Sequence, residues 1–300
     1  MASMDSLLPG DLVSVDWLAA HLDHPELVVV DIRGYVKTED HGGGRQTAAY
    51  LGARSEYEES HIPGSVFIDW TQDIVEPDSL VKAQLAPPHL FATRLGAIGV
   101  GDDTPVVVVD HAGGHFATRL WWALRYYGHD RVAILDGGLA AWNASGMPTN
   151  DQRVIPVQRM FTPRPRPNMR SIAEDVVHQV ATGERQIVDA RDDEQFEGSA
   201  QRGSRGGHIP TARHLSAKSL FADAGTWKSP DEIRVIAEAA GVDLNRPVTA
   251  YCNGGVTATA VLFGLNRAGL VEGSNYDGSW NEWGERDDLP VEGNRDLWST

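Results

Sequence analysis

The two halves of this chain repeat each other, which limits the folds that it can adopt. Four motifs occur twice, in the same order, within the 300 residues. They are Val-Asp-x-Arg, His-Ile-Pro, a strand-like run closed by aspartate or cysteine, and Asp-Gly followed by tryptophan. The paired positions are Asp31 and Asp189, His61 and His208, Asp110 and Cys252, and Asp136 and Asp277. Because four ordered landmarks rarely recur by chance, we expect a duplicated unit and two similar domains.

The join between the two copies is rich in proline. Residues 147–167 contain Pro148, Pro156, Pro163, Pro165 and Pro167. Proline at this density excludes regular helix and central strand, and it is typical of a semi-rigid linker. With 41% hydrophobic residues, each half is long enough to bury its own core. We therefore expect an N-terminal domain over residues 10–155, a linker over 156–167 and a C-terminal domain over 168–295.

Each copy alternates short β-branched runs with helical patterns, which is typical of an α/β fold. In the second copy, residues 186–189 and 248–251 are candidate buried strands, and residues 230–240 and 257–268 are candidate helices. Buried strands separated by helices predict a parallel sheet with helices on both faces. The first copy carries an insert, residues 38–54, whose glycine and polar content predicts a surface loop.

Cys252 follows the second candidate strand, at the edge of the sheet where parallel α/β folds bind ligands. Gly254 and Gly255 permit positive φ angles that turn backbone N–H groups inward, and Thr257 suits the N-cap of the next helix. Amide donors and a positive helix end lower the pKa of a thiol and stabilise thiolate and persulfide anions. We therefore expect a nucleophilic Cys252 within an anion-binding loop of Asn253, Gly254, Gly255, Val256 and Thr257. The alternative is a buried cysteine that only fills space.

Composition excludes several kinds of site and partner. One cysteine can form neither an internal disulfide nor a multi-cysteine zinc or iron–sulfur site. No phosphate-binding, dinucleotide-binding or metal-binding motif is present, so no cofactor or metal is expected. The formal net charge of −16 disfavours nucleic acid and anionic membranes as partners. Residues 1–6 lack a basic or apolar signal region, and no apolar run is long enough to span a membrane, so a cytoplasmic location is expected.

The motifs of the second copy resemble those of the tandem rhodanese sulfurtransferases, a group that includes thiosulfate and 3-mercaptopyruvate sulfurtransferases. The motifs are Asp189-x-Arg191, Gly-His-Ile-Pro at Gly207, Cys-x-x-Gly-Val-Thr at Cys252 and Asp-Gly-Ser-Trp at Asp277. The resemblance extends from Val15 to about Pro290. It implies two α/β domains with the active site at their interface and a ping-pong cycle through a Cys252 persulfide. It also implies a catalytically silent first domain, in which Asp110 stands at the nucleophile position.

The resemblance predicts a small anionic sulfur donor and a thiophilic acceptor such as cyanide or a thiol. The donor is thiosulfate or, as the alternative, 3-mercaptopyruvate. Thiosulfate enzymes usually carry basic residues after the cysteine and mercaptopyruvate enzymes carry Gly-Ser, whereas this chain has Asn253 and Gly254. The serine of the proton relay proposed for mercaptopyruvate enzymes is also missing. These motifs do not specify an oligomeric state.

Arginines are the candidates for holding the donor, because a guanidinium binds carboxylate or sulfonate oxygens through two parallel hydrogen bonds. The family usually places one arginine six residues after the aspartate of Asp-x-Arg, where this chain has Gln195. A second family arginine precedes Gly-His-Ile-Pro, and Arg202 is its best match, with Arg205 as the nearby alternative. Arg191 is a further candidate, although a structural ion pair with Asp189 or another carboxylate is the favoured interpretation.

Residues present in both copies are interpreted as structural, because the silent copy has no chemistry to preserve. This applies to His61, His208 and Asp277. Trp280 has no counterpart in the first copy and is a candidate for the pocket wall. Trp121 and Trp122 are expected in the core or at the domain interface.

Three other functions compete with sulfur transfer. A cysteine phosphatase needs an arginine six positions after its cysteine, where this chain has Ala258. A cysteine hydrolase needs a histidine partner, which the sequence neither identifies nor excludes. A non-catalytic persulfide carrier or binding scaffold would share the same motifs, and turnover with thiosulfate and cyanide separates it from an enzyme.

Overall fold

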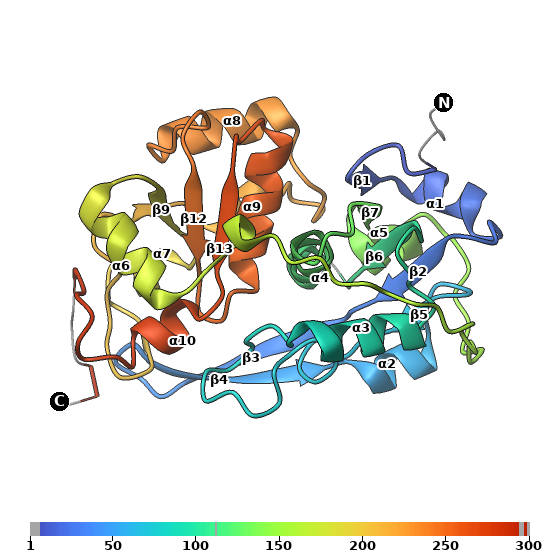
Figure 1. The fold of residues 1–300 in the computed structure, drawn as a ribbon, viewed down its shortest axis with the longest axis horizontal. Helices are drawn as coiled ribbons and strands as arrows, with labels where there is room; N and C mark the ends of the chain where they lie inside the picture. Colours follow the sequence, from blue (N-terminus) through green and yellow to red (C-terminus); the bar gives the residue numbers. More distant parts are fainter. Residues whose placement is uncertain (1–6, 112, 294–296, 299–300) are drawn as a thin grey trace.

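The computed structural model of the chain describes residues 7–111, 113–293 and 297–298. Two α/β domains lie side by side, the N-terminal one on the right of Figure 1 and the C-terminal one on the left. The predicted end of the second domain, residues 294–295, falls outside the described residues, and so does the segment 1–6. Within the described ranges, no helix combines the length and the apolar character needed to cross a bilayer.

A five-stranded parallel sheet forms the centre of the first domain, in the order β1-β7-β6-β2-β5. Its strands are β1 (Leu12–Val13), β2 (Val28–Asp31), β5 (Val66–Phe67), β6 (Val106–Val109) and β7 (Val132–Leu135). The helices around it are α1 (Val15–His21), α2 (Arg54–Glu59), α3 (Pro88–Ala97), α4 (His115–Tyr126) and α5 (Gly138–Ala144). Every residue of β6 and β7 is buried, which accounts for their continuous apolar sequence.

The second domain has a five-stranded parallel sheet of the same topology, in the order β8-β13-β12-β9-β11. Its strands are β8 (Arg170–Ser171), β9 (Gln186–Asp189), β11 (Arg213–His214), β12 (Val248–Tyr251) and β13 (Gly273–Tyr276). The helices are α6 (Ala173–Thr182), α7 (Asp193–Phe196), α8 (Pro230–Ala239), α9 (Thr257–Arg267) and α10 (Ser279–Trp283), with 3-10 turns at Pro167–Met169 and Ala217–Leu220. The sequence repeat is therefore a structural repeat, and the predicted fold class is confirmed.

The predicted elements of the second copy agree closely with the structure. Strands β9 and β12 have the expected bounds, and helices α8 and α9 each end one residue earlier than expected. The predicted N-cap of α9 is wrong, because Thr257 is its first helical residue and Val256 occupies the cap position without a side-chain bond. Val256 already has right-handed helical dihedrals, with φ −88° and ψ −61°, so the helical conformation starts one residue before Thr257.

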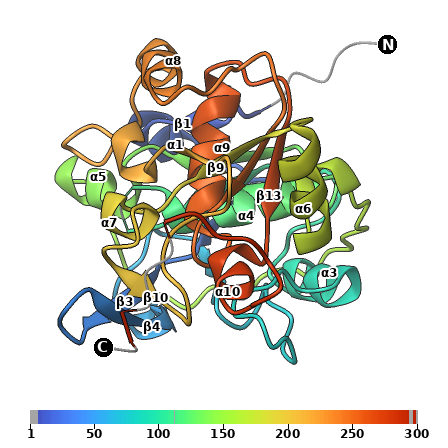
Figure 2. The ribbon, with the colours of Figure 1, turned by 90° about the vertical axis from the view of Figure 1, so that its left-hand side faces the viewer.

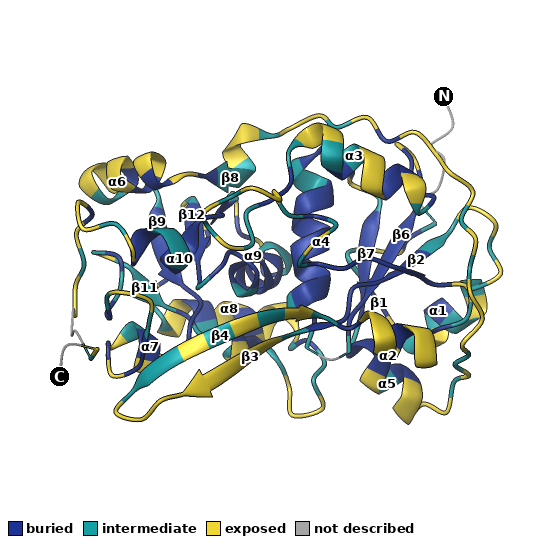
Figure 3. Ribbon diagram, turned by 90° about the horizontal axis from the view of Figure 1, so that it is seen from below, coloured by how far each residue is buried: buried dark blue, intermediate teal, exposed yellow. Residues whose placement is uncertain are grey.

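The insert of the first copy is a β-hairpin and not the predicted surface loop. Strands β3 (Gly34–Asp40) and β4 (Arg45–Gly52) pair along their whole length. Strand β4 also pairs in parallel with β10 (Gln201–Arg202) of the second domain, so a three-stranded sheet joins the two domains (Figure 2). The hairpin is long and largely exposed along its outer face (Figure 3). Its glycines, which led to the prediction of a loop, form the turn between the strands.

The two domains share a hydrophobic core built around α4 and α9, which lie against each other between the sheets (Figure 3). The ring of Trp121 on α4 meets Phe263 on α9 edge to face, with ring centroids 5.0 Å apart. Trp122 donates its indole N–H to the carbonyl of Met169, at the start of the second domain. Both tryptophans thus lie at the domain interface, as expected. This packing fixes the position of the pocket between the domains.

Candidate active site

A pocket of about 320 Å³ lies between the domains at the carboxyl ends of β9 and β12. Residues from both domains line it, including the predicted Cys252, Asn253, Gly254, Val256 and Thr257. The first domain contributes Val36, Thr38, Tyr50, Trp70, His115 and Phe116. An opening at the ends of parallel strands is where α/β sheets bind ligands. The anion-binding loop predicted from the sequence therefore faces the pocket between the domains.

The Asp-Gly-Ser-Trp motif holds Cys252 in place. The thiol residue is 3% exposed and follows β12 directly. Its backbone N–H donates to Ser279 Oγ at 3.1 Å, and its carbonyl accepts from the N–H of Trp280 at 3.0 Å. The hydroxyl of Ser279 in turn donates to the carbonyl of Tyr276 at 2.7 Å. These bonds explain why a motif some 25 residues away in sequence accompanies the cysteine loop.

The loop after Cys252 presents a row of unsatisfied amide donors. The backbone N–H groups of residues 253–257 have no hydrogen-bond acceptor among the described residues. Gly255 has a φ of +69°, whereas Gly254 does not use the left-handed region, so only one of the two glycines is needed for the turn. Helix α9 begins at Thr257 and adds the positive end of its dipole. Such a loop is suited to binding an anion.

The first domain shows the same loop with a carboxyl group at the position of the cysteine. Asp110 takes the position of Cys252, and its carboxylate accepts from the N–H groups of Gly114, Phe116 and Ala117 at 3.3, 3.1 and 3.2 Å. Burial raises the pKa of Asp110 to about 7, although the three amide donors act to lower it. The strand–loop–helix unit of this fold therefore directs three amide donors at the side chain that stands in the position of Cys252.

Arg202 lies on strand β10 and presents its guanidinium to the pocket. Its Nη2 donates to Thr38 Oγ1 of the hairpin at 2.8 Å. Its Nε is buried and has no hydrogen-bond partner within the described part of the chain. Burial lowers the pKa of Arg202 from its usual value, while Tyr50 and Cys252 act to raise it. This arginine therefore has a free donor beside the cysteine.

The other two candidate arginines have little capacity left for a donor. Arg191 lies at the pocket but is buried and bound to Asp189, with Nη2 2.6 Å from Oδ2. Its guanidinium also stacks on Trp280, 4.3 Å from the ring centroid, which places that tryptophan behind the arginine and not at the pocket wall. Arg205 does not line the pocket, because its guanidinium donates to the backbone carbonyls of Trp283, Gly284, Arg286 and Leu289.

Gln195, at the position of a family arginine, connects three parts of the site. Its Oε1 accepts from Asn253 Nδ2 at 2.9 Å, and its Nε2 donates to Gln46 Oε1 at 3.1 Å. The neutral side chain thus ties helix α7 to the cysteine loop and to the hairpin. It is 5% exposed and contributes no charge to the pocket.

Two first-domain residues of the pocket were not identified from the sequence. The phenol oxygen of Tyr50 accepts from Asn281 Nδ2 at 3.1 Å, and it lies within 3.0 Å of where a Cβ on Gly254 would stand. His115 is half-buried, and loss of solvation lowers its pKa to about 4, so its imidazole is neutral near pH 7. No signal in the sequence links either residue to Cys252, because both reach it across the domain boundary.

The two histidines at equivalent positions of the repeat, His61 and His208, make structural contacts. The ring nitrogens of His61 lie 2.6 and 3.1 Å from the carbonyl oxygens of Tyr57 and Gln152. His208 Nδ1 lies 2.8 Å from the carbonyl oxygen of Phe196 and its ring stacks on that side chain. Neither histidine lines the pocket.

Comparison with known proteins gives a consistent assignment. A family model of the rhodanese-like domain matches residues 14–145 and again residues 173–286. The 3-mercaptopyruvate sulfurtransferase of Escherichia coli K12 is 33% identical over 283 residues, which cover 93% of this chain and 97% of that protein. The human 3-mercaptopyruvate sulfurtransferase is 34% identical and the thiosulfate sulfurtransferase of Cricetulus griseus 32% identical, each over 91% of both proteins.

The solved structures agree with the sequence comparison. SseA from Escherichia coli, described among the 3-mercaptopyruvate sulfotransferases, matches with a TM-score of 0.78 at 30% identity, over 90% of this chain and 98% of that one. The matched family domain occurs twice here, and the two sheets share one topology. The chain therefore belongs to the rhodanese family, as a sulfurtransferase with two rhodanese-like domains in tandem.

Proposed function

We propose that the protein moves a sulfane sulfur from a small anionic donor to a thiophilic acceptor through a persulfide on Cys252. The observation that carries the proposal is the contrast between the two copies of one loop. In the first copy the amides are satisfied by Asp110, and in the second they surround a cysteine and have no acceptor among the described residues. A persulfide anion on Cys252 would supply the missing negative charge.

The chemistry balances without a cofactor. The Cys252 thiolate attacks the outer sulfur of thiosulfate, and an S–S bond forms between Cys252 Sγ and that sulfur. The S–S bond of the donor breaks, and sulfite leaves with the bonding electron pair. Cyanide or a thiolate then attacks the outer sulfur of the persulfide. The S–S bond of the persulfide breaks, and the Cys252 thiolate leaves with its electrons. The loop amides can stabilise both anions, because the thiolate carries its charge on Sγ and the persulfide carries it on the outer sulfur, one S–S bond away.

The donor is held, in this proposal, by Arg202 and the loop amides. Arg202 lines the pocket and has a buried Nε without a partner among the described residues, whereas Arg191 is paired with Asp189. A pocket of about 320 Å³ suits a small ion. Thiosulfate is the first candidate, since its departing sulfite needs no proton from the protein.

3-Mercaptopyruvate is the second candidate, and Tyr50 favours it. Burial raises the pKa of Tyr50, so the phenol keeps its proton over the physiological range. Its oxygen accepts one hydrogen bond from Asn281, and no acceptor for its own hydrogen exists among the described residues. When 3-mercaptopyruvate gives up its sulfur, the remaining pyruvate unit must gain a proton, which a neutral phenol in the pocket can supply.

The test is steady-state turnover with each donor and cyanide on one preparation. Catalytic formation of thiocyanate, many molecules for each protein, is expected of a sulfurtransferase. Loading of a single sulfur without turnover would instead support a persulfide carrier. The ratio of kcat/KM for thiosulfate and 3-mercaptopyruvate then identifies the preferred donor. A cytoplasmic location, which the sequence suggests, is tested separately by fractionation of cells.

A further inference from the structure

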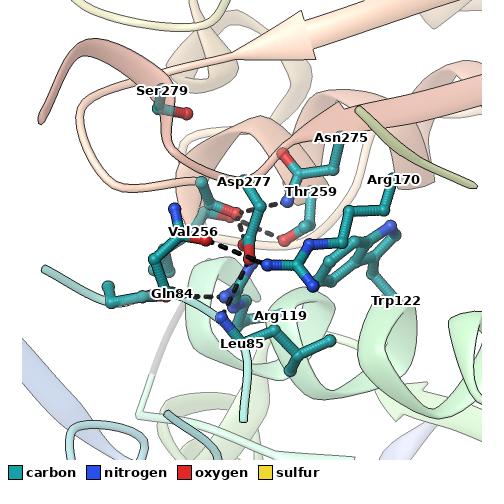
Figure 4. Close-up of polar contacts among 12 residues, drawn as sticks. Gln84, Leu85, Arg119, Trp122, Arg170, Val256, Thr259, Asn275, Asp277 and Ser279 are labelled. Atoms are coloured by element: carbon teal, nitrogen blue, oxygen red, sulfur yellow. Dashed lines mark hydrogen bonds and ion pairs between the residues drawn. The ribbon is translucent and has the colours of Figure 1, made fainter. Parts of the chain in front are cut away.

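A buried charge network crosses the domain boundary beneath the cysteine loop. Asp277 follows β13 in the second domain. Its carboxylate forms ion pairs with Arg119 of helix α4 at 2.6 Å and with Arg170 at 3.0 Å. It also accepts from the backbone N–H of Leu85 at 2.8 Å. Figure 4 shows Arg119 and Arg170 both reaching the carboxylate of Asp277. Arg119 and Asp277 are each 1% exposed, so solvent does not screen this pair.

Arg119 does more than neutralise Asp277, because it also bonds to the cysteine loop. Its Nη1 donates to the carbonyl oxygen of Gly255 at 3.1 Å. Asn275 Nδ2 donates to the same oxygen at 3.0 Å, so this carbonyl has two donors. The third contact of Arg119, from Nη2 to the carbonyl of Ala83 at 2.7 Å, fixes the guanidinium within its own domain. Arg170 bonds to Asp277 and Gln84 but not to the loop.

The direction of the Gly255 carbonyl determines where the next amide points. In a trans peptide the C=O of one residue and the N–H of the following residue point in opposite directions. Holding the Gly255 carbonyl toward the domain interface therefore turns the N–H of Val256 the other way, and Val256 lines the pocket that contains Cys252. Two donors on the carbonyl also polarise this peptide group and strengthen its N–H as a donor.

The conformation of the loop leaves little freedom for another arrangement. Gly255 has a φ of +69°, and a Cβ on it would stand 2.8 Å from the backbone oxygen of Asp277.

The network also contains two arginines and one aspartate, and thus an excess of one positive charge in a protein whose formal net charge is −16. A buried positive charge beside the loop favours an anion on the sulfur.

We propose that Arg119, supplied by the catalytically silent domain, is a positioning residue for the Cys252 loop. It orients the Gly255–Val256 peptide so that its N–H serves the sulfur anion, and it acts through the loop without touching the donor. The silent domain is thereby part of the catalytic unit and not only a wall of the pocket.

The experiment compares Arg119→Ala with Arg170→Ala in the full chain. Each change removes one positive charge and one partner of Asp277, but only Arg119 bonds to Gly255. The first readout is the pH profile of Cys252 alkylation by iodoacetamide, measured without any sulfur donor. The second is kcat and KM for thiosulfate with cyanide. The third is the free energy of unfolding, which measures the structural loss common to both variants.

For Arg119→Ala we expect the alkylation profile to move to higher pH by about one unit, and kcat to fall about tenfold with KM changed less than about threefold. Arg170→Ala should lower stability but move the profile by no more than about 0.3 units, because the Arg170 side chain is 24% exposed, so that solvent screens its charge, and it makes no bond to the loop. Arg119→Lys retains the charge, so its alkylation profile should lie between those of the wild type and Arg119→Ala. This variant also serves as the test if Arg119→Ala does not fold. The titratable side chains at the pocket stay unchanged in all variants; they are Tyr50, His115, Arg191, Asp192, Arg202 and Lys218.

An unshifted profile in both Arg119 variants, or equal shifts in Arg119→Ala and Arg170→Ala, would overturn the positioning role. Because this role of Arg119 assumes that Cys252 is the nucleophile, the two ideas need separate readouts. Alkylation uses no donor, so it reports on the loop even if the proposed sulfur transfer is wrong. Loss of turnover with an unchanged profile would refute the role of Arg119 while leaving Cys252 as the nucleophile.

Discussion

Arg202 of the second domain and Thr38 of the first are joined by a hydrogen bond of 2.8 Å across the domain boundary. The bond holds the guanidinium at the pocket, where its Nε has no partner among the described residues. The position of the arginine that we propose to bind the donor therefore depends on the hairpin inserted in the first copy. This hairpin is the part of the structure that the sequence pattern did not reveal.

Removing Arg202 should weaken donor binding selectively. A charge-assisted hydrogen bond contributes about 1.5–3 kcal/mol, so Arg202→Ala should lower kcat/KM for thiosulfate roughly ten- to a hundred-fold. Thr38→Val, which removes only the supporting hydroxyl, should have a smaller effect in the same direction. Thr47→Val is a control on the same hairpin, because Thr47 bonds to His41 away from the pocket. An unchanged kcat/KM for both donors in Arg202→Ala would mean that the loop amides alone hold the donor.

Arg191 should matter for stability before it matters for binding. Arg191→Ala leaves the fully buried Asp189 without its ion partner, and breaking such a pair lowers the free energy of unfolding by about 3–5 kcal/mol. Arg33→Ala is the matched change in the silent domain, where Arg33 pairs with Asp31 at 2.9 Å. Urea unfolding should show similar losses for the two variants. A stable Arg191→Ala protein with a large rise in KM would instead assign Arg191 to donor binding.

Tyr50 should distinguish the two donors. Tyr50→Phe removes the phenol proton, so kcat/KM for 3-mercaptopyruvate should fall at least tenfold while that for thiosulfate changes less than about threefold. Tyr35→Phe is the control, because Tyr35 lies on the same hairpin and donates to Glu56 at 2.6 Å. Equal losses with both donors would show that Tyr50 only shapes the pocket.

Asp110 should make the silent domain sensitive to pH. Its pKa is raised from 3.8 to about 7 in the folded protein, so the folded state holds a proton that the unfolded state releases. The stability from this group is present below about pH 4 and is lost as pH rises toward 7. The difference in free energy of unfolding between wild type and Asp110→Ala should therefore shrink over that range, by at most about 4 kcal/mol. A difference that grows with pH would show that the three amides hold the carboxylate charged.

The sequence was sufficient for the parts of the structure that depend on local patterns. Strands β9 and β12 are short runs buried along their whole length, and they were located to the residue. The loop at Cys252 was recognised because strand end, cysteine, glycine turn and helix follow one another along the chain. The family followed from the pairing of this loop with the Asp-Gly-Ser-Trp motif.

The contacts that cross the domain boundary could not be predicted in this way. Strand β4 pairs with β10 about 150 residues further along the chain, and no periodicity connects such distant segments. Tyr50 and Arg119 reach the cysteine loop from the first copy, and no motif in the sequence links either residue to Cys252. Asp277 is interpreted as structural from the repeat, but its two arginine partners are visible only once the domains are packed together.

The central claim is that the sulfur passes through Cys252, and mass spectrometry under single-turnover conditions tests it most directly. Intact protein mixed with thiosulfate should gain one sulfur atom, located on the peptide that contains Cys252, and cyanide should remove it at the rate of turnover. Cys252→Ser should fold normally but gain no sulfur and retain less than about a hundredth of the activity. Turnover without any sulfur adduct, or activity that survives in Cys252→Ser, would contradict the account.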